Sequence, residues 1–153
     1  MTVTHADFTI ERRFDCTPQQ TFAAFADPGL KRRWFALPDS WLDVEWELDF
    51  RVGGGEISRG RSPGGSNFAF ESRIHDIVDN ERIVFAYNLS QDARLMSVSL
   101  TTVEFFPEAD GTRLVFTEQG AFFDDLDSPA EREHGTGKLL EALERLLAGE
   151  PVR

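Results

Sequence analysis

The chain has 153 residues, 41% of them hydrophobic and 28% charged, which is the size and composition of one globular domain. Its formal net charge of −11 argues against nucleic acid and anionic membranes as partners, because both would repel it. The single cysteine excludes an internal disulfide, and we expect one cytoplasmic domain over residues 1–153.

The N-terminal segment predicts a strand followed by a helix. In residues 7–14, apolar and polar side chains alternate, which is typical of a half-buried strand. Thr17 and Pro18 predict a helix start, because threonine is a good N-cap and proline fits the first helical turn. The sequence Asp27-Pro28-Gly29 is expected to end this helix.

A second short helix and a series of strands are expected next. The helix spans 30–35, with its basic residues 31–33 exposed and Trp34 and Phe35 facing inward. Beyond it, period-two alternation is broken by glycine-rich and Asx turns. The expected strands are 43–52, 54–61, 67–79, 82–89, 94–107 and 112–119. Their short connections indicate antiparallel neighbours.

The last expected element is an amphipathic helix. Ser128 and Glu131 have the spacing of a capping box, and leucines at helical spacing follow them. Gly149 and Pro151 are expected to end the helix. A curved antiparallel sheet with one apolar face must be covered, and this helix is the available cover. The predicted fold class is therefore α+β.

Short motifs spread over nearly the whole chain carry a family resemblance. They are Thr17-Pro18 with Phe22 and Phe25, Asp27-Pro28, Trp34-Phe35, Arg51-Val52-Gly53-Gly54, Asn80-Glu81-Arg82-Ile83-Val84-Phe85, Asp110-Gly111-Thr112-Arg113-Leu114, and Gly135 ahead of Leu140 and Leu143. In this order they resemble the SRPBCC (START-like) superfamily, and within it the bacterial Aha-type proteins, named for homology to the activator of a heat-shock-protein ATPase. The resemblance implies a helix-grip (Bet v-like) fold, in which about seven strands grip the long C-terminal helix around a cavity.

One position departs from the family pattern. Where the family usually has a tryptophan after the helix glycine, this chain has Thr136, and Gly137 follows. Two glycines cost roughly 1 kcal/mol each in a helix interior. The departure either makes room at the mouth of the cavity or marks a kinked or frayed helix start.

Aromatic residues are the strongest functional signal, with 14 Phe, 3 Trp and 1 Tyr. Apolar ligand sites are typically lined by such rings together with a few polar groups. The expected ligand-binding residues are Trp34, Phe70, Phe85 and Tyr87, with His75 and Arg73 as polar anchors if their strand face points into the cavity. Otherwise Arg73 and His75 are ordinary solvent-facing residues.

No complete catalytic motif is present, so an enzymatic role is left uncertain. Its candidate titratable groups are His75, Tyr87 and Glu118. Glu131-x-x-His134 lacks the second copy that a carboxylate di-metal site needs, and neither a metal nor a cofactor is expected.

The leading hypothesis is binding of a small apolar or aromatic molecule. Two alternatives stay open. One is a cyclase- or hydrolase-type enzyme acting on an aromatic or polyketide-like substrate, and the other is a stress-response or co-chaperone-like interaction module. A homodimer is also left open.

Overall fold

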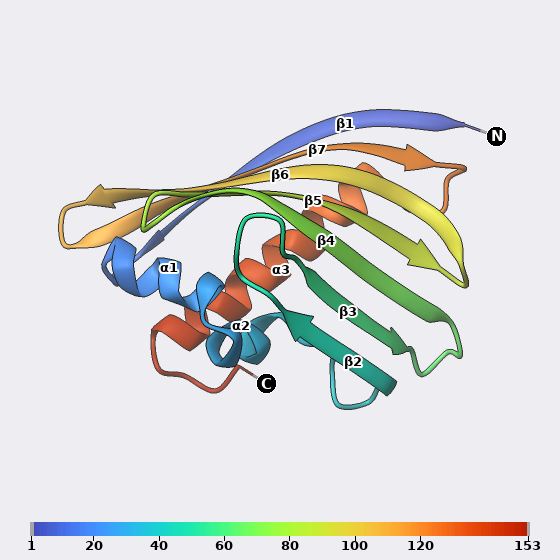
Figure 1. The fold of residues 1–153 in the computed structure, drawn as a ribbon, viewed down its shortest axis with the longest axis horizontal. Coiled ribbons are helices and arrows are strands. Elements are labelled where there is room, and N and C mark those ends of the chain that lie inside the picture. Colours follow the sequence, from blue (N-terminus) through green and yellow to red (C-terminus); the bar gives the residue numbers. More distant parts are fainter. Residues whose placement is uncertain (1, 153) are drawn as a thin grey trace.

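The computed structural model describes residues 2–152. Within them, seven strands form one curved antiparallel sheet and three helices lie against its concave side (Figure 1). The strands are β1 (Val3–Phe14), β2 (Leu42–Leu48), β3 (Glu56–Arg61), β4 (Asn67–Val78), β5 (Arg82–Gln91), β6 (Arg94–Glu108) and β7 (Gly111–Phe123), and the helices are α1 (Pro18–Ala26), α2 (Pro28–Phe35) and α3 (Pro129–Leu147). This confirms the predicted helix-grip architecture.

The sheet order is β1-β7-β6-β5-β4-β3-β2, so the first strand lies beside the last. The strands predicted over 43–52 and 54–61 were too long where they meet, because residues 49–55 form a turn between β2 and β3. A side chain at Gly55 would place its Cβ 1.9 Å from the carbonyl oxygen of Ser72, so only glycine permits this close approach to β4.

Side chains cap the two short helices, and the cap at Thr17 was predicted. The Thr17 hydroxyl accepts a hydrogen bond from the backbone N–H of Gln20 at 3.1 Å, and the Gln20 side chain accepts one from the N–H of Thr17 at 3.0 Å. Helix α2 begins two residues earlier than expected. Asp27 both ends α1 and caps α2, since its carboxylate accepts the N–H of Gly29 at 2.8 Å.

The hydrophobic core lies between the sheet and the helices. Leu140 and Leu143 of α3 are fully buried, as are Val103 and Leu114 on the facing strands. Helix α3 runs obliquely beneath the sheet (Figure 1). None of the helices in the described part of the chain is long and apolar enough to cross a membrane.

The predicted exposure of the basic residues of α2 is wrong at one position. Arg32 and Arg33 are exposed, but Lys31 is buried on the same helix face as Trp34. Its ammonium lies 2.6 Å from a carboxylate oxygen of Glu56 on β3. The other Glu56 oxygen accepts the indole N–H of Trp46 at 2.9 Å. Burial of Lys31 is tolerated because its charge is paired.

Candidate ligand-binding cavity

A cavity of about 290 Å³ lies between the concave face of the sheet and the first half of α3. Side chains from all three helices, from β4, β5 and β7, and from the loop before α3 form its wall. They are Phe25, Lys31, Trp34, Phe35, Phe70, Phe85, Tyr87, Leu89, Phe116, Glu118, Asp127, Glu131, Arg132, Gly135, Thr136, Leu139 and Leu140. Glu131 and Gly135 are exposed, which places the mouth of the cavity beside the first turns of α3.

The four aromatic residues expected to bind ligand all line this cavity. Phe70 on β4 and Phe85 on β5 flank Tyr87, with ring centroids 4.7 and 6.2 Å from the tyrosine ring. Phe35 contacts Phe70 edge-on, and Trp34 is buried behind Phe35. Pairing of β4 with β5 therefore builds one continuous aromatic wall.

Arg73 and His75 do not reach the cavity. Both are exposed, whereas their neighbour Ile74 is buried on the concave face. Successive side chains of a strand point to opposite faces, and the bulge in β4 comes only after Ile74. The condition for their role as polar anchors, a strand face that points into the cavity, is therefore not met, and both are solvent-facing residues.

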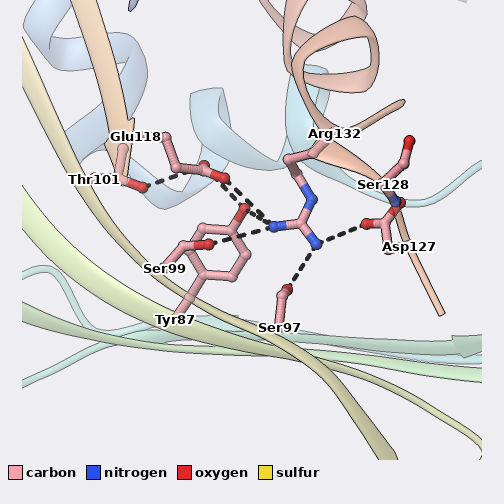
Figure 2. Close-up of polar contacts among 8 residues, drawn as sticks. All are labelled: Tyr87, Ser97, Ser99, Thr101, Glu118, Asp127, Ser128 and Arg132. Carbon is pink, nitrogen blue, oxygen red and sulfur yellow. Dashed lines mark hydrogen bonds and ion pairs between the residues drawn. The ribbon is translucent and has the colours of Figure 1, made fainter. Parts of the chain in front are cut away.

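Arg132 occupies the centre of a buried polar cluster in the cavity wall (Figure 2). One terminal nitrogen donates to the hydroxyl of Tyr87 at 2.8 Å and to a Glu118 oxygen at 3.4 Å. The other donates to Asp127 at 2.8 Å and to Ser97 at 2.7 Å. We call Arg132, Glu118, Tyr87, Asp127, Ser97, Ser99 and Thr101 the Arg132 cluster.

Glu118 on β7 is the most buried acid of this cluster, with 2% of its surface exposed. Its second oxygen accepts hydrogen bonds from Tyr87 at 2.9 Å and Thr101 at 3.4 Å. Burial raises the pKa of Glu118, and the charge of Arg132 and the tyrosine hydrogen bond only partly oppose this. Burial, reinforced by the Glu118 charge, also raises the pKa of Tyr87.

The family model of the Activator of Hsp90 ATPase homolog 1-like proteins matches residues 15–148. The chain belongs to this family. The resemblance read from the scattered motifs is thereby confirmed. The comparison with curated proteins gave no significant match.

Solved structures of bacterial proteins agree with this membership. The Mll3558 protein of Rhizobium loti is 49% identical, with 94% of this chain and 98% of that chain covered and a TM-score of 0.88. An uncharacterised protein of Rhizobium leguminosarum is 38% identical over 97% of this chain and 98% of that one, with a TM-score of 0.92. An AHSA1-like protein of Aeromonas hydrophila, 20% identical over 97% of this chain and 96% of that one with a TM-score of 0.69, shares the fold.

Thr136, which departs from the family pattern, and the glycines on either side of it bear directly on the cavity. Helix α3 is continuous through Gly135 and Gly137, so its start is not frayed. Thr136 is buried and lines the cavity, and a Cβ at Gly135 would meet no heavy atom within 4 Å. In this Activator of Hsp90 ATPase homolog 1-like chain, small residues therefore leave open space on the cavity side of α3.

Sequence reasoning did not find Arg132 or Lys31. Arg132 precedes Thr136 and Leu140 at four-residue steps, so it continues the buried stripe of α3. An arginine in line with the buried positions of a helix was the sequence signal that could have indicated a buried charge. In the described residues, no three His, Cys, Asp or Glu side chains are grouped to hold a metal ion, and Asp127 is bonded to Arg132 instead.

Proposed function

We propose that this protein binds a small, mostly apolar molecule in the cavity beneath α3. The supporting observation is an open volume of about 290 Å³ lined mainly by aromatic and aliphatic side chains. Ligand sites span roughly 300 to 1,000 Å³ and have this composition, so the volume suits a compact guest. Each Å² of apolar surface buried would contribute about 25 cal/mol before the costs of association.

The volume is large for a packing defect. Protein interiors are close-packed, and voids larger than a water molecule are few. Here the side chains that border the space come from separate elements, and Gly135 and Thr136 are small where larger residues would reduce it. Family membership is compatible with this role and with a co-chaperone-like protein interaction.

A blocked-cavity variant tests the proposal. Thermal unfolding would be followed with naphthalene, an apolar aromatic probe, for the parent protein and for Thr136→Trp, whose indole would occupy the cavity. A ligand that binds only the folded state raises Tm, so Tm should rise for the parent and not for the variant.

The control is Glu133→Trp, which adds the same ring at an exposed position of α3 and should keep the response. Unchanged melting of the parent with naphthalene and with other small aromatic compounds would contradict the proposal.

One observation favours an enzyme as a second candidate. Glu118 faces the cavity with a raised pKa, as a general acid would. Both of its oxygens, however, already accept hydrogen bonds within the Arg132 cluster. Loss of a measured turnover in Glu118→Gln, with ligand binding retained, would identify a catalytic role.

A further inference from the structure

The cavity has two polar regions, and they differ in their free hydrogen-bonding capacity. In the Arg132 cluster, the terminal nitrogens of Arg132 and both Glu118 oxygens are engaged within the protein. At the other region, Glu56 is the one hydrogen-bond partner of the Lys31 ammonium among the described residues. An ammonium carries three donors, so Lys31 keeps donor capacity beside the cavity that it lines.

The surroundings of Lys31 are aromatic. Its nitrogen lies 4.2 Å from the ring centroid of Phe35 and 5.3 Å from that of Trp34, and both rings line the cavity. A ligand ring seated on this wall would bring an attached polar group to the ammonium. A hydrogen bond there would form in a dry environment, where it is stronger than in water.

The charges around the cavity disfavour an anionic ligand. The two cations, Lys31 and Arg132, face four carboxylates, which are Glu56, Glu118, Asp127 and Glu131. The negative excess remains even when Glu118 is protonated. A ligand carboxylate bound to Lys31 would also lie close to the Glu56 carboxylate and be repelled by it, and the net charge of −11 would repel it at long range.

A cationic ligand meets a different obstacle. Two of the aromatic rings that line the cavity already lie against protein cations, Phe35 against Lys31 and Tyr87 against Arg132. A second ammonium would lose its hydration and be repelled by Lys31. The cavity therefore suits an uncharged guest.

We propose that the ligand is a neutral aromatic molecule with a hydrogen-bond acceptor such as a carbonyl oxygen, and that Lys31 donates to this acceptor. The inference rests on the proposed function and adds the chemical class of its ligand.

Four naphthalene probes of similar size test the proposal by calorimetric titration: naphthalene, acetylnaphthalene, naphthoate and aminomethylnaphthalene. Acetylnaphthalene should bind roughly fivefold to tenfold more tightly than naphthalene, as one net hydrogen bond implies. Naphthoate and aminomethylnaphthalene should bind no more tightly than naphthalene.

The double variant Lys31→Met/Glu56→Gln removes the donor and the buried charge together and leaves an acceptor for Trp46. It should lose the preference for the ketone over naphthalene. Lys138→Met, at an exposed lysine of α3, is the control and should keep the preference.

Tighter binding of naphthoate than of acetylnaphthalene, or equal binding of acetylnaphthalene and naphthalene by the parent, would overturn this inference and leave the proposed function standing. A ketone preference that persists in a folded double variant would exclude Lys31 as the donor. Both proposals would be overturned if no probe binds the parent and if none of the four changes the Tm of Thr136→Trp.

Discussion

Two buried ion pairs distinguish this protein at the scale of single residues. Arg132 and Glu118 are 8% and 2% exposed at their side chains, and Lys31 and Glu56 are 8% and 5% exposed. A buried pair gives little net stability compared with apolar packing, but removing one partner leaves an uncompensated charge. Each pair joins a helix to a strand of the sheet.

Arg132→Met should be strongly destabilising. It leaves Glu118 and Asp127 without their cation and should cost about 3 to 5 kcal/mol in the free energy of unfolding at neutral pH. Urea denaturation of Arg132→Met, Glu118→Gln and the double variant measures the coupling. We expect the double variant to cost clearly less than the sum of the singles.

The control is Arg82→Met. Arg82 pairs with Asp76 at 2.6 Å, but both side chains are nearly half exposed and screened by water, so its loss should destabilise the protein far less than the loss of Arg132. Equal costs for the buried and exposed arginines, or strict additivity at Arg132 and Glu118, would contradict the interpretation.

Glu118 should also make stability depend on pH in a direction opposite to most acids. Because burial raises its pKa in the folded state, the folded protein binds the extra proton more readily than the unfolded chain. Its favourable contribution is complete below the ordinary glutamate pKa of about 4.3 and is lost as the pH rises through the higher folded-state value.

The measurement is the free energy of unfolding of the parent relative to Glu118→Gln between acidic and neutral pH. This difference should move against the parent as the pH rises. A difference that moves in favour of the parent would show that Arg132, rather than burial, controls the Glu118 pKa.

At the scale of elements, α3 is attached to the sheet in two ways. Its C-terminal half buries leucines such as Leu143, and its first turns are held by Arg132 through β5, β6 and β7. Between Arg132 and Leu140 the helix carries Gly135 and Gly137, which contribute no apolar packing. The cavity lies along this weakly packed stretch.

Gly135→Ala should stabilise the protein by about 0.5 to 1 kcal/mol, because alanine favours a helix interior and its Cβ would meet no heavy atom within 4 Å. Gly149→Ala is the matched control. Its Cβ also meets open space, but Gly149 has φ +74°, which strains alanine. Chemical denaturation should give opposite signs for the two. Destabilisation by Gly135→Ala would contradict the open geometry at that position.

At the scale of the whole molecule, charge is the dominant feature. The net charge of −11 is carried by 27 acidic and 16 basic residues, so mutual repulsion opposes the compact state. Surface ion pairs such as Arg82 with Asp76 offset little of it.

Moderate salt should therefore raise Tm. Sodium chloride near 0.15 M shortens the Debye length to about 8 Å and screens repulsion between exposed carboxylates. Scanning calorimetry from low to moderate salt should show a steady rise. A fall in Tm would mean that attractive surface pairs outweigh the repulsion.

Local sequence patterns determined the elements and the family. The Thr17 N-cap, the capping-box spacing of Ser128 and Glu131, and the period-two runs predicted three helices and seven strands, because caps and periodicity depend on near neighbours in the chain. The alternation of side chains along a strand also predicts the face on which Arg73 lies. Phe70 and Arg73 are three positions apart, so in a regular strand only one of them can face the cavity.

The tertiary structure alone decided which charged groups are buried. The sequence predicts Lys31 to be an exposed helix residue. In the structure, β3 places Glu56, 25 positions away in the chain, beside its ammonium. Arg132 is in line with the buried stripe of α3, but its partners Tyr87 and Glu118 are supplied only where α3 crosses their strands. A buried charge is tolerated only when it is paired with an opposite charge. Long-range packing supplies that partner, and no local sequence pattern encodes it. The periodicity of the chain thus determined the cavity wall, and the packing of α2 and α3 against the sheet determined its chemistry.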